Sequence, residues 1–339
     1  MRTISVLCTL VIAIYIIILV VNLGGFVDQI VTSQLRQQIY ETIMETQKHL
    51  PLEERRKMAE ELLSLEIKRL GFDKPFLYRS FIYLKNALIW DFGRSFRITS
   101  SSGSKTVALI ILERLGPTIL LFTSLNVIIF LSQLFGGLIA SRHYGKLADR
   151  IVTYSAPLSS VPGWFYGIFV ILIFSAWLRL LPFSGMLSIP PPEDPLLKVL
   201  DIAWHMIGPT ISWFIAYLPI GIYYYRTFFL IFSKEDYVEL AYAKGLPQSL
   251  VERRYILRPA LPPIITSFAL IVIGSWTGAI ITETVFGWPG MGRLLYEALQ
   301  AMDSPVLLAT STIYAYLLAI TVIVLDVVYM VVDPRVRLT

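Results

Sequence analysis

The stretch SKEDYVELAYAKGLPQSLVERRYILRPALPP, residues 233–263, is the one long polar passage between two strongly apolar segments of this chain. Its first part predicts a short helix over residues 236–244, because Ser233 can cap the helix start. Gly245 stands where a helix ends in a left-handed residue, and Pro247 prevents continuation. We therefore expect an ordered helix that stops at this point.

A second helix is predicted directly after this turn. Ser249 and Glu252 form an S-x-x-E capping box at its start, and the helix runs toward Leu257. The prolines expected to end it before the next apolar segment are Pro259, Pro262 and Pro263. The whole stretch is thus predicted to be a helix, a turn and a second helix.

Part of the first helix offers a surface on which another protein could dock. Ala241, Ala243 and Gly245 carry little side chain, so a second backbone could approach closely. Tyr237 and Leu240 supply apolar anchors beside them. The alternative is an ordinary loop between membrane helices whose charges are simply solvated, and composition alone leaves both interpretations open.

The composition is that of a membrane protein. Of 339 residues, 55% are hydrophobic and 16% are charged, whereas charged residues make up about a quarter of a soluble domain. The net charge of +5 does not indicate nucleic-acid binding, because the positive residues cluster at the ends of apolar segments and form no separate basic stripe. The single cysteine, Cys8, lies in an apolar run and can form no disulfide within the chain.

Apolar runs predict the membrane topology, because a bilayer core needs about 20 apolar residues to cross it. The expected transmembrane helices cover residues 3–27, 115–140, 151–178, 202–225, 259–282 and 304–325, the last extending to about 332. The first run could instead be a cleaved signal peptide, but it is long for one and no small-residue cleavage site follows it. We expect an all-α polytopic membrane protein with six transmembrane helices.

Between the first two predicted spans lies a large region, residues 28–114, which we expect to be helical and extracytoplasmic. Leu62, Leu65, Ile67 and Leu70 recur there near helical spacing, with charged residues filling the other face. This pattern predicts an amphipathic helix, and a solvated surface helix without a binding role is the favoured interpretation. The permease core would then cover residues 115–339.

Basic residues in the short connections indicate the orientation. On one side the connections carry Arg142, Lys146, Arg150, Arg226, Lys234, Lys244, Arg253, Arg254 and Arg258, and on the other only Arg179, Lys198 and Arg293. The positive-inside rule places the 233–263 stretch and both termini in the cytoplasm, and the 28–114 region outside. A cytoplasmic protein could therefore reach the 233–263 stretch.

The 233–263 stretch resembles the coupling loop of a known family. Glu239-Leu240-Ala241, three residues and then Gly245 fit the E-A-A-x-x-x-G loop of inner-membrane permease subunits of binding-protein-dependent ABC importers. Asp236-Tyr237 and AKGL at 243–246 resemble the dipeptide, oligopeptide and nickel branch. The loop departs from the wider pattern at Leu240, which replaces an alanine, and at Arg258, a departure that the peptide branch shares.

Further motifs extend this resemblance from about residue 71 to the C-terminus. They are, in order, GFDKPF at 71–76, DFGRSF at 91–96, LPFSGM at 181–186, ETVFGWPGMGRLL at 283–295 and VDPRVR at 332–337. The family's pGDP-like stretch after the first helix is not visible. Several separated motifs in the right order make the resemblance specific, whereas the outer region is unusual.

The resemblance implies a coupling site and a set of partners. The residues implied for ATPase coupling are Asp236, Tyr237, Glu239, Ala241, Ala243, Lys244 and Gly245. The implied partners are a homologous second permease subunit, two cytoplasmic ATPase subunits that hold ATP and Mg²⁺, an extracytoplasmic substrate-binding protein and the lipid of a prokaryotic inner (plasma) membrane. The implied mechanism is alternating access, with this chain forming half of the translocation pathway.

No catalytic constellation is visible in the chain. It has no G-x-x-x-x-G-K-[ST], H-E-x-x-H or G-x-S-x-G motif, so we predict a transport subunit without a cofactor of its own and not an enzyme. The histidines, His49, His143 and His205, are too scattered to predict a metal site.

Candidate pathway residues are Tyr217, Tyr224, Trp276 and Glu283. Tyrosine and tryptophan also form interfacial belts, which is the alternative for the aromatic residues. Glu283 and Asp326 lie at or near the ends of apolar runs, where an acid could relay protons or simply sit at the interface.

The cargo expected from the resemblance is an oligopeptide, and oligosaccharides and nickel are the alternatives. A rival of another class is an ion-driven secondary transporter, which would carry ionisable residues mid-helix and internal repeats. Neither feature is evident, since the charged residues bound the apolar runs. A membrane-embedded enzyme would need a paired nucleophile and base, which the sequence does not offer.

Overall fold

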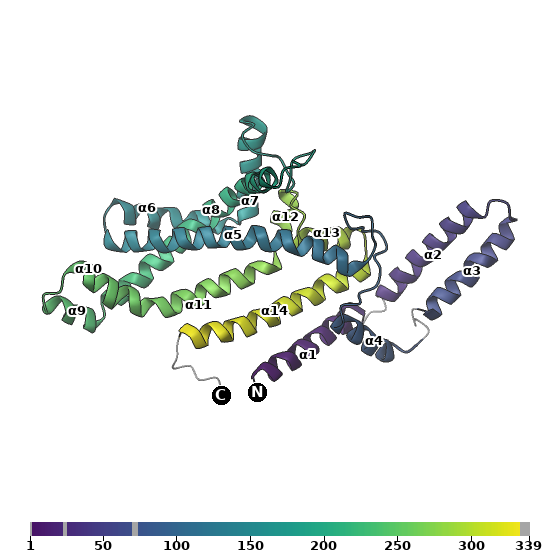
Figure 1. The fold of residues 1–339 in the computed structure, drawn as a ribbon, viewed down its shortest axis with the longest axis horizontal. Helices are drawn as coiled ribbons and strands as arrows, with labels where there is room; N and C mark the ends of the chain where they lie inside the picture. Colours follow the sequence, from purple (N-terminus) through teal and green to yellow (C-terminus); the bar gives the residue numbers. More distant parts are fainter. Residues whose placement is uncertain (1, 23–25, 70–73, 333–339) are drawn as a thin grey trace. The chain divides into compact units, whose positions relative to one another are not determined.

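The computed structural model describes residues 2–22, 26–69 and 74–332, and its regular elements there are helices (Figure 1). The chain divides into two compact units. Unit 1 comprises residues 1–113 and 294–320, and unit 2 comprises residues 114–293 and 321–339. Residues 71–73 of the GFDKPF motif and 333–337 of the VDPRVR motif lie outside the described residues.

Unit 1 combines apolar helices with polar ones. Its helices are α1 (Arg2–Asn22), α2 (Phe26–Thr46), α3 (Leu52–Arg69), α4 (Phe76–Leu88), most of α13 (Met291–Gln300) and the first part of α14 (Ser304–Val332). α1 packs against α4, with Ile14 and Ile18 fully buried beside Ala87. The ring of Tyr15 stacks on that of Phe81, with 5.4 Å between centroids.

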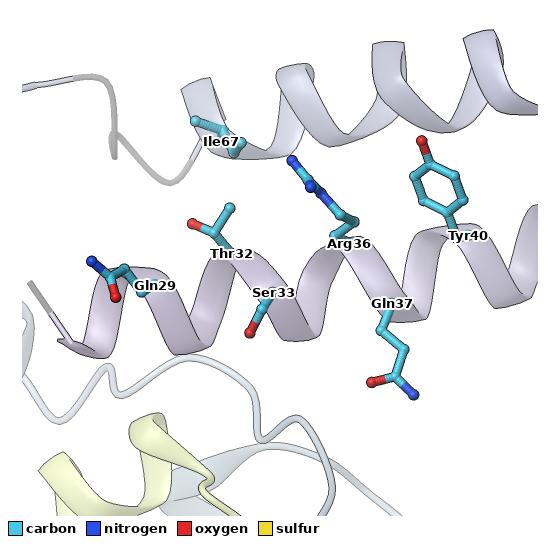
Figure 2. A pocket seen from close by; sticks show the side chains of 7 residues that line it. All are labelled: Gln29, Thr32, Ser33, Arg36, Gln37, Tyr40 and Ile67. Carbon is cyan, nitrogen blue, oxygen red and sulfur yellow. The ribbon is translucent and has the colours of Figure 1, made fainter.

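α2 and α3 form a hairpin within the predicted outer region (Figure 1). The predicted helix is present, but its packed face consists of Ala59 and Leu63, while Leu62 and Leu65 are exposed. Figure 2 shows Arg36 and Tyr40 of α2 pointing toward α3, where they line a cavity of about 610 Å³. The packed face of α3 is therefore apolar, but it is formed by Ala59 and Leu63 and not by Leu62 and Leu65.

The loop after α4 is tied to the start of α14 inside unit 1. Asp303 is fully buried, and its Oδ2 accepts from Ser95 Oγ at 2.6 Å and from the N–H groups of Phe96 at 3.0 Å and Arg97 at 2.9 Å. Ile98 N–H lies 3.3 Å from the same oxygen. The end of the DFGRSF motif thus forms a backbone nest for one carboxylate.

Unit 2 holds the longest helices. Its elements are most of α5 (Val107–Arg142), α6 (Leu147–Ser155), η1 (Ala156–Ser160), α7 (Gly163–Val170), η2 (Ile171–Trp177), α8 (Pro195–Ser233), α9 (Asp236–Ala243), α10 (Gln248–Val251), η3 (Glu252–Leu257), α11 (Arg258–Gly274), η4 (Ser275–Thr277), α12 (Ile280–Val285) and the start of α13. α5 and α8 approach closely at Gly137, where an added Cβ would lie 2.5 Å from Tyr225 Cβ. A small residue is required at this crossing.

Among the described residues, four helices are long and apolar enough to cross a membrane. They are Val107–Arg142, Pro195–Ser233, Gln248–Val272 and Ser304–Leu325. A bent pair, Leu147–Ser160 and Gly163–Trp177, makes a fifth if it counts as one span, and α1 offers a shorter apolar helix, Ser5–Val20. The chain is an all-helical polytopic membrane protein, and the count of six stays a prediction.

Two predicted spans are not straight helices. The 151–178 run bends by 93° between its two parts, at a break where Pro162 caps α7. The 259–282 run is interrupted after α11, because Gly278 adopts φ +71° before α12 begins. Composition predicts apolarity over both runs but carries no information about these breaks.

Candidate functional site

The predicted coupling segment is an ordered helix, α9, at the end of unit 2 where α8 finishes; we call this the inner end (Figure 1). Its C-terminus is a Schellman motif, in which Leu246 N–H donates to Ala241 O at 3.3 Å and Gly245 N–H to Tyr242 O at 2.9 Å. Gly245 has φ +74°, which confirms the left-handed residue predicted there. Backbone hydrogen bonds and a conformation that favours glycine together fix the end of α9.

The start of α9 differs from the prediction. Ser233 is the last residue of α8, and its hydroxyl donates to Leu230 O at 2.8 Å, so the predicted Ser233 cap is wrong. Glu235 occupies the N-cap position in an extended conformation without a side-chain hydrogen bond. The reason is that α8 continues through its apolar end as far as Ser233 and absorbs the residue expected to cap its successor.

Two side chains anchor α9 within unit 2. Val238 and Ala241 are buried in an apolar cluster whose other members are Phe130, Tyr225, Phe229, Val251, Ile256, Ala260 and Ile264. These residues come from α5, α8 and the helix that runs from α10 into α11. The small Ala241 side chain thus contributes to packing inside the unit, and α9 is not a loosely attached loop.

The other residues predicted for coupling lie on the outer surface of α9 and its end. They are Asp236, Tyr237, Glu239, Ala243, Lys244 and Gly245. Tyr237 and Leu240 are 39% and 55% exposed and form apolar positions between the charges. An exposed face of this mixed character suits a protein partner, whose identity stays a prediction.

The second predicted helix begins earlier and ends later than expected. α10 starts at Gln248, so Ser249 lies inside its first turn and the predicted capping box is wrong; Glu252 instead pairs with Arg142 at the end of α5, at 2.7 Å. The π-helical turn η3 comes directly before the prolines, and the helix continues through all three of them as α11. A π-turn widens the backbone by one residue, which relieves the clash between the ring of Pro259 and the preceding turn.

A buried ion pair at the inner end was not predicted from the sequence. Arg226 of α8 donates from Nε to Asp149 Oδ1 at 2.6 Å and from Nη2 to Oδ2 at 3.0 Å. Gly145 N–H adds a third donor to Asp149 at 2.8 Å, and the Arg226 guanidinium lies 4.9 Å from the centroid of the Tyr144 ring. This arrangement joins the start of α6 to α8, directly before α9. Sequence alone shows an acid and a base 77 positions apart, without a signal that they meet.

The candidate pathway residues occupy different environments. Tyr217 and Tyr224 on α8 are partly exposed, the first packed on Trp213 with 4.9 Å between ring centroids. Trp276 is half-buried in η4. The structure does not bring these three to one site, and their place on a pathway stays a prediction.

Glu283, the remaining pathway candidate, is fully buried and caps the start of α13. Its Oε1 accepts from Thr118 Oγ1 at 2.8 Å, and its Oε2 accepts from Arg293 N–H at 2.8 Å. Thr118 Oγ1 in turn accepts from Met291 N–H at 2.7 Å. Burial raises the pKa of Glu283 to about 7, although these hydrogen bonds to the carboxylate lower it. An added Cβ at Gly290 would lie within 2.5 Å of this carboxylate, which explains why the motif needs glycine there.

The described residues contain no group of three or more His, Cys, Asp or Glu that could hold a metal. Two of the histidines are engaged with their own helices: His205 Nδ1 lies 2.8 Å from Asp201 O, and His143 Nδ1 lies 2.9 Å from Ile139 O. The side chain of Asp326 lies outside the described residues.

Comparisons with known proteins place the chain in a family. A family model described as "Binding-protein-dependent transport system inner membrane component" matches residues 132–338. The chain is 33% identical over 291 residues to a di/tripeptide transport system permease protein of Pseudomonas aeruginosa, covering 80% of this chain and 84% of that protein. It is 29% identical to an oligopeptide transport system permease protein of Bacillus subtilis over 80% of this chain and 84% of the relative.

A glutathione transport system permease protein of Escherichia coli is 28% identical, covering 82% of this chain and 85% of the relative. Among solved structures, an inward-facing MetNI methionine ABC transporter matches 66% of this chain and 94% of that chain, with 13% identity and a TM-score of 0.44. The family model covers more than half of the chain and includes α8, α9 and α11. The chain belongs to the family of binding-protein-dependent transport system inner membrane components.

Proposed function

We propose that this permease component works in an ATP-driven importer of peptides and forms half of its translocation pathway by alternating access. The observation that carries this proposal is α9, which has a fixed C-terminus, buried anchors and an exposed polar face at the inner end of unit 2. A helix held in this way can follow the motion of a partner bound to its outer face. The membrane is the prokaryotic inner (plasma) membrane, with both termini in the cytoplasm.

The partners follow from the same assignment. Two cytoplasmic ATPase subunits, which hold the ATP and Mg²⁺, dock on α9 and on the equivalent helix of a second permease subunit. A substrate-binding protein delivers cargo from the other side. Di/tripeptides, oligopeptides and glutathione are named for the relatives, and this supports a peptide cargo for this chain. Oligosaccharides and nickel are the alternatives that a binding assay would separate.

Gly245 provides the test of coupling. Its φ of +74° with no atom within 4 Å of an added Cβ means that Gly245→Val strains the backbone by about 1–2 kcal/mol without a packing clash. Gly103→Val is a matched control, because Gly103 has φ +78° and is equally open but lies in unit 1. In proteoliposomes holding the assembled transporter, we expect Gly245→Val to retain ATP hydrolysis and lose peptide uptake.

The control variant, Gly103→Val, should keep the same ratio of peptide uptake to ATP hydrolysis as the parent transporter. Normal coupled uptake in the Gly245 variant would overturn the role of α9. A tagged chain purified from mild detergent should also retain a second permease and ATPase subunits. Purification of a lone chain without nucleotide hydrolysis, in several detergents, would instead favour an ion-driven transporter.

A further inference from the structure

A cavity of about 760 Å³ lies at the inner end of unit 2, lined mainly by α5 and the continuous helix from α10 to α11. One wall carries Leu134, Phe135 and Leu138 of α5. The opposite wall carries Leu257, Leu261 and Ile264. The walls are apolar, and neither the coupling face of α9 nor the Glu283 cap contributes to them.

Three arginines, Arg253, Arg254 and Arg258, line the same cavity. They lie on η3 and at the first position of α11, so the helix leads away from them toward Leu261 and Ile264. At 1.5 Å per residue, these two side chains are set about 5 and 9 Å deeper along the helix than Arg258. The cavity is therefore cationic at its inner edge and apolar beyond it.

The three arginines differ from two other arginines of the inner end, Arg142 and Arg226. Arg142 pairs with Glu252, and Arg226 pairs with Asp149. The cavity arginines are exposed, and their side chains make no hydrogen bond or ion pair with any residue that the structure describes. Their charge is thus not neutralised within this chain.

We propose that this cavity binds an anionic phospholipid of the cytoplasmic leaflet. The arginines hold the phosphate, since a guanidinium offers two parallel N–H donors to phosphate oxygens, and an acyl chain lies between α5 and α11. Basic pockets between membrane helices on the cytoplasmic side recognise such headgroups. The charge order along the helix matches that of a lipid, with the anion at the surface and hydrocarbon beneath. This site goes beyond the transport role and requires only that the inner end faces the cytoplasm.

The test uses the purified full chain, incubated with phosphatidylglycerol or phosphatidylcholine in mild detergent and examined by native mass spectrometry. A triple variant, R253Q/R254Q/R258Q, removes the phosphate ligands. Each arginine near a membrane surface strengthens anion binding about fivefold, so the triple variant should bind phosphatidylglycerol about a hundredfold more weakly. The charge-matched control is K146Q/R150Q/K234Q, which removes three exposed inner-end charges outside the cavity.

A second variant, Leu261→Trp, fills the apolar part of the cavity without changing charge. It should reduce phosphatidylglycerol retention while leaving the thermal unfolding temperature close to that of the parent chain, because Leu261 is 44% exposed. Equal retention of the two lipids, or equal loss in the cavity triple and the control triple, would overturn the proposal. Loss of co-purifying ATPase or second permease in the cavity triple, with lipid retention unchanged, would assign the arginines to a protein interface and overturn it as well.

Discussion

Replacing Arg226 with glutamine should destabilise unit 2 strongly. The guanidinium donates to both carboxylate oxygens of Asp149, at 2.6 and 3.0 Å, and the two side chains are 13% and 6% exposed. Among the described residues, the variant leaves the carboxylate with Gly145 N–H, at 2.8 Å, as its donor. Removing one partner of a buried ion pair costs about 3–5 kcal/mol, because the other charge stays uncompensated. The small residual exposure of Arg226 puts the expected loss near the lower limit, about 3 kcal/mol.

A double-mutant cycle isolates the pair. Asp149→Asn and the double variant with Arg226→Gln complete the cycle, and we expect a coupling free energy above about 1 kcal/mol, since the residues are in direct contact. Arg226→Lys keeps the charge but loses the two-pronged geometry and the planar stacking on Tyr144, so its loss should be intermediate. The measurement is reversible unfolding of the full chain by SDS titration in mixed micelles. Single variants within 0.5 kcal/mol of the parent, or losses that simply add, would refute this reasoning, since about 0.5 kcal/mol is what unlinked surface changes produce.

Three further changes test other parts of the chain. Gly137→Ala should cost about 1–3 kcal/mol in the same titration by overpacking the crossing of α5 and α8, whereas Gly274→Ala, with nothing within 4 Å, should be neutral or slightly stabilising. Asp303→Asn should lower the unfolding free energy by about 2 kcal/mol through lost charge-assisted hydrogen bonds, while Asp194→Asn, at the N-cap of α8, should be neutral because asparagine caps equally well. The raised pKa of Glu283 means that the folded state holds this proton more tightly, so stability should fall as pH rises from about 4.5 through about 7. In Glu283→Gln that slope should be lost from the pH profile of thermal unfolding.

Membrane helices were predictable where apolarity is continuous, and their ends were not. The predicted span 202–225 stops at Arg226 because a charge normally ends an apolar run, yet α8 continues to Ser233. The helix can continue because Arg226 is neutralised by Asp149 on another helix. The apolarity of a run reflects the free energy of placing each residue in the membrane by itself. It contains no information about a partner elsewhere in the chain that could neutralise a charge.

The segment from α9 to α11 likewise has features set by neighbouring residues and features set by distant ones. Gly245 and Pro247 predicted its end correctly, because the Schellman motif is made by residues within one turn. The Glu252 interaction was misassigned, since the local S-x-x-E pattern competes with Arg142, which lies 110 positions earlier. Local capping patterns predict what a side chain can do, and tertiary packing decides which partner it takes.

The packing of the inner end bears on whether a helix as short as α9 could transmit the movement of a partner. Moving a two-state element from 1:99 to 99:1 takes about 5.5 kcal/mol of differential binding, and a flexible attachment would dissipate it as loop motion. α9 is held by Val238 and Ala241 in a cluster that includes residues of α5, α8 and α11. The Glu252–Arg142 pair ties η3, which continues into α11, to α5, and the Asp149–Arg226 pair ties α6 to α8. A displacement of α9 would therefore move several membrane helices together. In the proposed importer, variants that weaken either ion pair should reduce peptide uptake per ATP hydrolysed, even where the transporter stays assembled.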